Sequence, residues 1–130
     1  MRFVTFAKRG RAVAGVISES GEEVIDLSVA VPRLADLNAI IEGGGRALDQ
    51  VRAALRTRKQ GARRPRKGVR LMAPIPVPRR NIFCVGKNYH EHAKEFHSSG
   101  FDASAGKAAI PEYPIIFSKS WTTVIGPGEP

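Results

Sequence analysis

A short stretch of the sequence holds two residues that could carry out acid–base chemistry. His92 and Glu95 lie three positions apart in residues 89–96, which we expect to be helical. Side chains with this spacing share one face of a helix, so the Glu95 carboxylate can accept a hydrogen bond from the His92 imidazole. The imidazole, with an ordinary pKa of about 6.5, can take a proton near neutral pH, and the carboxylate fixes its tautomer. The pair is a candidate general base with its orienting partner; on a plain surface helix it would add only about 0.2–0.5 kcal/mol.

The segment before this helix must position it. Residues 82–85 are apolar and predict a buried strand. Gly86 then allows the backbone to turn where a side chain would collide with a ligand or a neighbouring segment, although an ordinary turn at a strand end explains it equally well. Asn88 and Tyr89 follow and could hydrogen-bond a substrate, while Tyr89 would serve as well in a core.

Other reactive side chains nearby have weaker functional interpretations. His90 and His97 are expected to be surface histidines. Position 94 is lysine, so the run does not fit the H-E-x-x-H pattern of zinc proteases. Cys84 lies inside the apolar strand and is expected to be a small buried hydrophobic residue rather than a nucleophile.

Basic residues are concentrated in the middle of the chain. The formal net charge is +9, and no acidic residue occurs between Asp49 and Glu91. The segment Arg52–Arg70 within this interval could bind phosphate, attract a small anionic substrate, or form a solvated linker. Nucleic-acid binding is the less favoured of these, because residues 50–80 contain no Phe, Tyr or Trp for base stacking.

The composition indicates a folded, soluble protein. The chain has 130 residues, of which 42% are hydrophobic, enough for one ordinary domain or two small ones. No apolar run approaches the length of a membrane span, and residues 1–30 lack the pattern of a secretory signal. A single cysteine excludes an internal disulfide and suits a reducing compartment. We therefore expect a cytoplasmic protein without a membrane partner.

The N-terminal part predicts a meander of three strands followed by helices. The strands, separated by glycine-containing turns, are expected over residues 2–7, 12–18 and 23–27. Ser28 or Asp36 could cap a first helix, which the glycines at 43–45 would end. A second, amphipathic helix is expected from Arg46.

The remainder predicts a linker and further strands. Residues 57–68 lack apolar periodicity and contain glycine and proline, so we expect a linker or exposed loop there, and a domain boundary near residue 70. Prolines at 74, 76 and 78 hold the chain extended. Strands are expected over residues 69–72, 82–85, 115–117 and 122–125, with a long loop over 97–112.

Four motifs in order resemble the fumarylacetoacetate hydrolase family. The family carries an I-x-C-V-G-x-N-Y strand, a D/E-H-x-x-E helix, a P-x-x-F-x-K strand and a V-G-P-G turn. The matching residues are 82–89, 91–95, 114–119 and 125–128. Residues 1–70 also resemble the small N-terminal domain that many members carry, including its Val24-Ile25-Asp26-Leu27 strand.

The resemblance implies an α+β fold in two domains. Residues 1–70 would form a small N-terminal domain of strand meander and helices, and residues 71–130 the incomplete start of a mixed β-roll catalytic domain. The implied activity is C–C hydrolysis, decarboxylation or isomerisation of 2-oxo, 2-hydroxy-dienoic or β-diketo acids, including acids from aromatic catabolism. The implied partners are a small keto-acid substrate and a second subunit in a homodimer.

The resemblance also assigns roles within the site. The His92–Glu95 dyad would activate the attacking water in hydrolysing members. Lys119 would pair with a substrate carboxylate, although a lysine at a strand end can simply be solvated; Ser120 replaces the proline that usually follows it. Residues 96–112 resemble the family's lid. The candidate substrate-binding residues are Gly86, Asn88, Tyr89 and Lys119.

A divalent metal, Mg²⁺ or Mn²⁺, is the implied cofactor. In the family its ligands are two glutamates of an E-x-E strand and an aspartate, all following the turn that matches Gly126–Gly128. No metal ligand is therefore assigned here, because Glu91 and Glu95 share a helical face but lack a third carboxylate. We expect the 130-residue chain alone to be inactive. The rival interpretations are a basic module that binds nucleic acid or other anions through Arg52–Arg70, and a non-enzymatic relative in which the first domain mediates assembly.

Overall fold

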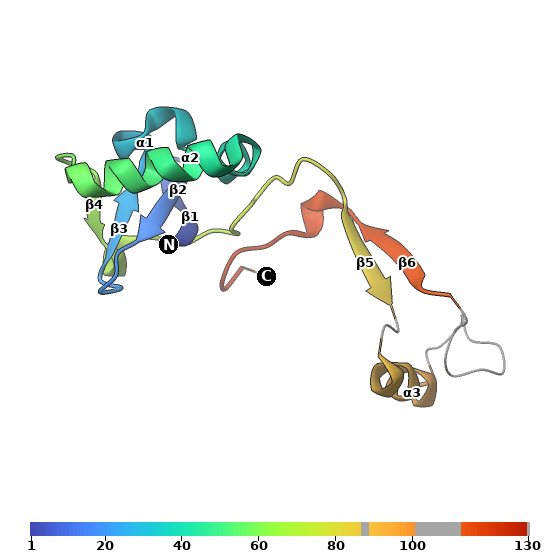
Figure 1. Ribbon diagram of the computed structural model, residues 1–130. Coiled ribbons are helices and arrows are strands. Elements are labelled where there is room, and N and C mark those ends of the chain that lie inside the picture. The colour runs from blue at the N-terminus through green and yellow to red at the C-terminus, as the bar shows by residue number, and fades with distance from the viewer. Residues whose placement is uncertain (87–88, 101–112, 130) are drawn as a thin grey trace. The chain divides into compact units, whose positions relative to one another are not determined.

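The computed structural model describes residues 1–86, 89–100 and 113–129 and shows an α+β protein (Figure 1). The chain forms two compact units. The first unit comprises Met1–Arg79 together with Val124–Pro130, and the second comprises Arg80–Thr123. Each unit is described by itself below.

The first unit is built on a four-stranded antiparallel sheet in the order β1-β2-β3-β4. Its strands are β1 (Arg2–Lys8), β2 (Arg11–Ile17), β3 (Glu23–Asp26) and β4 (Arg63–Pro65). The β1–β2 turn consists of Arg9 and Gly10, both with positive φ, as the commonest two-residue hairpin turn requires. The expected three-strand meander is confirmed.

Helices cover this sheet and complete the core. α1 (Leu27–Ala30) is followed by a short 3₁₀ turn, η1 (Pro32–Leu34), and by the long α2 (Leu37–Thr57). The core between α2 and the sheet contains Leu27, Ile40 and Val51. As expected, Asp36 caps α2, where its carboxylate accepts a hydrogen bond from Asn38 N at 3.1 Å.

As expected, the glycines at 43–45 end a first helical segment of α2, and a second segment begins directly after them. Gly44 alone leaves the helical conformation, with φ 53° and ψ −138°, and the helix resumes immediately after it. Ala47 and Val51, which follow the kink, are buried against the sheet. Their burial fixes the second helical segment against the sheet.

The expected loop over residues 57–68 is wrong in part. Arg63–Pro65 forms β4, which pairs with β3 so that Val24 faces Arg64, and Arg66–Gly68 forms a 3₁₀ turn, η2. The basic, proline-containing sequence does not predict this strand, because β4 is stabilised by its pairing with β3. Arg63 pairs with Glu23 and Arg64 with Asp26, so β4 brings positive charge to a strand that carries negative charge.

Residues 69–79 run along the first unit. Instead of the expected strand at 69–72, Leu71 makes an isolated bridge to Phe6. Met72 N donates to Thr5 O at 2.9 Å, and Asn38 Nδ2 donates to Val77 O at 3.2 Å. These contacts hold residues 69–79 within the first compact unit, which extends to Arg79. The domain boundary expected near residue 70 stays a prediction.

The second unit is a hairpin with one helix. β5 (Ile82–Gly86) pairs antiparallel with β6 (Ile115–Lys119), and α3 (His90–Ser98) follows β5 along the chain. The expected strand over residues 122–125 is wrong: Trp121–Thr123 forms a 3₁₀ turn, η3, in which Ser120 O accepts from Thr123 N at 3.1 Å. The serine in place of the family's proline supplies this turn with a side-chain acceptor as well.

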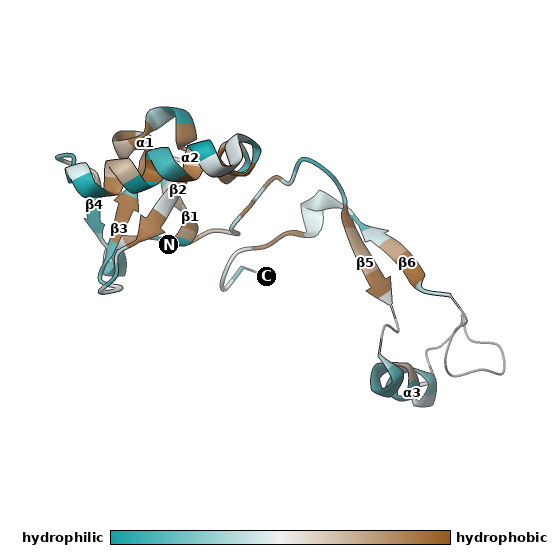
Figure 2. Cartoon of the chain, viewed as in Figure 1, coloured by the Kyte–Doolittle hydropathy of each residue, from teal (hydrophilic) through white to brown (hydrophobic). Residues whose placement is uncertain are grey.

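The two strands of the second unit are not buried, contrary to expectation. Phe83 is 74% exposed and Ile116 is 66% exposed, although both strands are predominantly hydrophobic (Figure 2). A two-stranded sheet cannot cover two apolar faces by itself. Among the described residues, no helix is both long and apolar enough to cross a membrane.

Candidate active site

Helix α3 carries the candidate acid–base pair. His92 and Glu95 both lie on it, one helical turn apart, with solvent-exposed side chains. Ala93, between them, is fully buried. The structure therefore confirms the expected helix and leaves both side chains exposed, and the catalytic role of the pair stays a prediction.

The space around Gly86 and the exposure of Tyr89 bear on the roles expected of these two residues. A methyl group added at Gly86 would lie 3.5 Å from Phe117 Cε1, an ordinary contact, so no described neighbour requires glycine there. Tyr89 is 71% exposed, which argues against core packing within the described residues. Its carbonyl accepts from Ala93 N at 2.9 Å. Asn88 and residues 101–112 of the expected lid lie outside the described residues.

Lys119 is placed away from Gly86. In the β5–β6 register Gly86 faces Ile115 at one end of the hairpin, whereas Lys119 faces Ile82 at the other. Four residues of strand separate the two ends, which corresponds to about 13 Å. The hairpin therefore brings Gly86 close to the start of α3 along the chain, but it does not bring Lys119 to the same end.

Some basic residues of the segment Arg52–Arg70 pair with acidic residues outside it. Arg63 pairs with Glu23, Arg52 Nη1 lies 2.7 Å from Asp49 Oδ1, and Arg70 lies 3.4 Å from Glu129. The interval that lacks acidic residues in the sequence therefore has acidic neighbours in the folded protein. This arrangement weakens the interpretation of Arg52–Arg70 as a free phosphate-binding surface.

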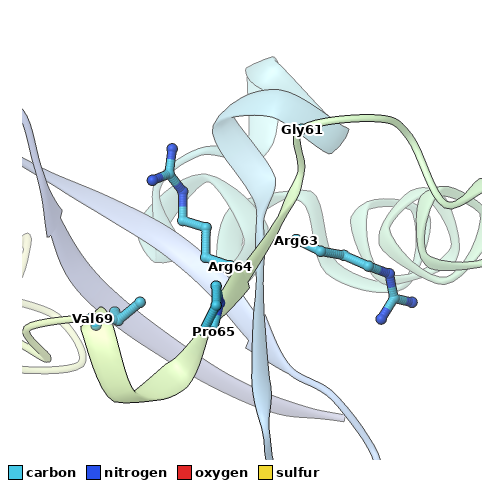
Figure 3. A pocket seen from close by; sticks show the side chains of 6 residues that line it. Gly61, Arg63, Arg64, Pro65 and Val69 are labelled. Atoms are coloured by element: carbon cyan, nitrogen blue, oxygen red, sulfur yellow. The ribbon is translucent and has the colours of Figure 1, made fainter.

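A hollow of about 380 Å³ lies beside β4. Its lining consists of Gly61, Arg63, Arg64, Pro65, Gly68 and Val69. Figure 3 shows the Arg63 and Arg64 side chains pointing to opposite sides of the strand, as consecutive strand residues must. The two guanidinium groups therefore do not converge on one anion.

Asp26 is a buried carboxylate with two cationic partners that the sequence pattern does not predict. It is fully buried, with Lys8 Nζ at 2.7 Å and Arg64 Nε at 3.2 Å. It also caps α1 by accepting from Ser28 N at 2.9 Å. Burial alone would raise the pKa of Asp26, but hydrogen bonds and the positive charge of Lys8 outweigh it and lower the pKa below its ordinary 3.8. The feature of the sequence that indicates this buried charge is an aspartate within the apolar run of residues 24–27.

The described residues do not fit a divalent metal. No group of three or more His, Cys, Asp or Glu side chains gathers among them. Glu91 and Glu95 on α3 offer two carboxylates, short of the oxygen cage that Mg²⁺ requires. No catalytic step is therefore assigned to a metal held by these residues.

Comparison with known proteins points to one family. Residues 81–130 match the family model described as fumarylacetoacetate (FAA) hydrolase C-terminal. Oxaloacetate tautomerase YisK of Bacillus subtilis (strain 168) is 35% identical over 99% of this chain and 44% of its own length. Oxaloacetate tautomerase FAHD2A, mitochondrial, of Bos taurus is 35% identical over 87% of this chain and 32% of its own length.

A solved structure is similar over both units. Fumarylacetoacetate hydrolase from the psychrophilic Exiguobacterium antarcticum matches 95% of this chain and 36% of that chain, with a TM-score of 0.52 and 30% identity. The chain spans less than half the length of the curated relatives cited here. Because the family model, the relatives and the solved structure agree, the chain belongs to the fumarylacetoacetate hydrolase family.

Proposed function

We propose that the protein catalyses proton transfer on a small 2-oxo acid, with keto–enol tautomerisation of oxaloacetate as the first candidate reaction. The observation that carries this proposal is the 35% identity to an oxaloacetate tautomerase over 99% of the chain. The exposed His92–Glu95 pair on α3 supports it, since the reaction needs a general base.

Tautomerisation requires only proton transfers at the site. The proton on C3 of the keto acid is removed and a proton is added to the C2 oxygen, so no carbon–carbon bond breaks and no water is consumed. Neutral His92 would accept the C3 proton through one ring nitrogen, while Glu95 accepts a hydrogen bond from the other and stabilises the imidazolium. The imidazolium would then return its proton to the enolate oxygen, directly or through water, which leaves the enzyme unchanged.

The same dyad would serve the other reactions of the family. In C–C hydrolysis His92 would take its proton from water, which attacks the substrate carbonyl, and decarboxylation would release CO₂ from the 2-oxo acid. Exposed Tyr89, immediately before α3, is the described hydroxyl best placed along the chain to bind substrate. Lys119 remains a proposed carboxylate partner, and Asn88 a proposed amide partner.

The proposal also covers the metal, the oligomeric state and the cellular location of the protein. A Mg²⁺ or Mn²⁺ requirement, a homodimer and a cytoplasmic location are part of it. Because no suitable group of ligands gathers among the described residues, the metal would have to take its ligands from elsewhere.

The test uses the protein expressed from its complete reading frame. Enol oxaloacetate is supplied, and its conversion is followed by the loss of enol ultraviolet absorbance, with pyruvate and CO₂ assayed in parallel. His92→Gln is expected to lower kcat by about 10²- to 10⁴-fold, and Glu95→Gln by a smaller factor. His90→Gln, on the same helix, is the matched control and should leave kcat within about twofold.

Three outcomes would contradict parts of the proposal. Cleavage of an acylpyruvate without tautomerase activity would move the protein to the hydrolase branch. Release of CO₂ at the rate of enol loss would indicate a decarboxylase. Equal activity of His92→Gln and the wild type would remove His92 as the base.

A further inference from the structure

A hollow of about 470 Å³ lies in the first unit, where the C-terminal end of α2 meets the sheet. The end of β2, the turn that follows it, β3 and the last residues of α2 contribute most of its lining. Sites for small molecules are commonly clefts of about 300–1,000 Å³. All of the lining belongs to the first unit, so the hollow is distinct from the His92–Glu95 pair on α3.

Apolar side chains form the floor of this hollow. Val16 lies opposite Ile25 in the β2–β3 register, so the two side chains share one face of the sheet, and both are buried. Leu55 adds a half-buried apolar side chain from α2. A ligand with a short apolar group would remove that group from water on this floor.

Hydrogen bonds hold the polar rim of the hollow in place. In the turn between β2 and β3, Ser18 N donates to Glu23 O at 2.9 Å, and Glu23 N donates to Ser18 Oγ at 3.1 Å. The Ser18 and Ser20 hydroxyl oxygens lie 3.0 Å apart. The carboxylate of Glu23 pairs with Arg63, so these two charges of the lining offset each other.

Two further charged side chains of the lining, Arg58 and Glu19, are exposed. Within the part of the chain that the structure describes, neither side chain makes a hydrogen bond or an ion pair. Arg58 ends α2 in the left-handed conformation, with φ 46° and ψ 45°, where glycine is the usual residue. An arginine there is strained, so its guanidinium, and not its backbone, suits this position.

We propose that the hollow binds an apolar α-amino acid, with L-leucine as the first candidate. The ligand's carboxylate would pair with Arg58 and its ammonium with Glu19, while its side chain covers the apolar floor. The carbonyl end of α2 also favours an ammonium over a second anion. A zwitterion supplies a counter-charge to both side chains, whereas a simple acid or a simple amine would supply only one. This binding goes beyond the proposed function and requires no turnover.

The first readout is isothermal titration of L-leucine into the protein expressed from its complete reading frame, without oxaloacetate. We expect a Kd on the order of 0.1–1 mM for so small a ligand. Arg58→Gly keeps the left-handed turn and removes the guanidinium, so it should weaken binding at least about tenfold. Glu19→Gln should weaken it similarly. Arg56→Ala removes an exposed cation of the same helical turn that lies outside the lining, and should stay within about twofold of wild type.

The second readout identifies the site and the ligand class. Bound L-leucine should slow hydrogen exchange over residues 16–25 and 55–63 and leave residues 40–50 unchanged. Leucine's analogues 4-methylpentanoate, which lacks the ammonium, and 3-methylbutylamine, which lacks the carboxylate, should each bind at least about tenfold more weakly. Circular dichroism of each variant checks that it is folded.

The proposal is overturned if L-leucine does not bind at about 10 mM, or if neither Arg58→Gly nor Glu19→Gln weakens binding. Equal affinity for 4-methylpentanoate would also overturn it and would assign the hollow to simple carboxylic acids. Because no assay here measures turnover, a failure of the proposed tautomerase activity would leave these outcomes unchanged.

Discussion

Replacing Asp26 by asparagine tests the buried charge cluster of the first unit. The carboxylate is fully buried and contacts Lys8 at 2.7 Å and Arg64 at 3.2 Å. Asp26→Asn preserves the size of the side chain and an oxygen that can accept from Ser28 N, so the cap of α1 is kept. What is lost is the negative charge between two cations.

The expected loss of stability follows from the burial of the partners. Breaking a fully buried ion pair costs about 3–5 kcal/mol. The side chains of Lys8 and Arg64 are 21% and 41% exposed, so water can solvate both once the carboxylate is neutral. We therefore expect Asp26→Asn to lower the free energy of unfolding by about 2–3 kcal/mol.

The loss should depend on pH with a definite sign. The pKa of Asp26 is lowered in the folded state below its ordinary 3.8. The contribution of the charge is therefore fully present above about pH 5 and is lost as the pH falls through the folded-state pKa. Wild type and Asp26→Asn should differ most near neutral pH and converge in acid.

The assay is urea unfolding of the 130-residue chain, followed by far-ultraviolet circular dichroism between pH 3 and 7. Asp36→Asn is the matched control, because Asp36 is an exposed cap of α2 that accepts from Asn38 N, and asparagine caps equally well. The control should change stability by less than about 0.5 kcal/mol. An Asp26→Asn loss no larger than this, or one independent of pH, would refute the reasoning.

Three further predictions follow from the packing and charge of the chain. Gly15→Ala should lower the free energy of unfolding by about 1–3 kcal/mol, because the new methyl would lie 2.7 Å from Val24 Cγ1; Gly45→Ala, with nothing within 4 Å, is the control, and equal urea midpoints would contradict the packing argument. Gly126→Ala should destabilise by a similar amount through Ala73 N at 2.9 Å, whereas Gly68→Ala, with open space around it, should be neutral or slightly stabilising in the same assay. Fluorescence anisotropy with a labelled DNA duplex should give a Kd no tighter than about 10⁻⁶ M at physiological salt; tighter, steeply salt-dependent binding would restore the basic-module interpretation.

The elements that could be predicted from the sequence are those stabilised locally. The β1–β2 hairpin has a two-residue turn containing Gly10, and α2 begins at an aspartate cap, so short-range patterns sufficed for both. β4 could not be predicted, because Arg63 and Arg64 become strand residues only through Glu23 and Asp26, about 40 positions earlier. The break of α2 at Gly44 could also be predicted, because a run of three glycines is a local signal for the end of a helical segment.

The candidate site was predictable as a list of residues but not as an arrangement. The His92–Glu95 spacing on one helix follows from the sequence, and the structure has the helix. The separation of Gly86 and Lys119 at opposite ends of the hairpin follows only from the β5–β6 register.

The position of β1 at the edge of the sheet has a consequence for the nascent chain during synthesis. β1 leaves the ribosome before β2, β3 and β4, yet its outer edge meets the chain again only at residues 70–72. Until those residues emerge, a nascent chain exposes an unpaired strand edge that can pair with other chains. Closing so long a loop is a slow, non-local event. We therefore expect a ribosome-stalled chain of residues 1–60 to recruit chaperones, and one extended past residue 80 outside the exit tunnel to release them.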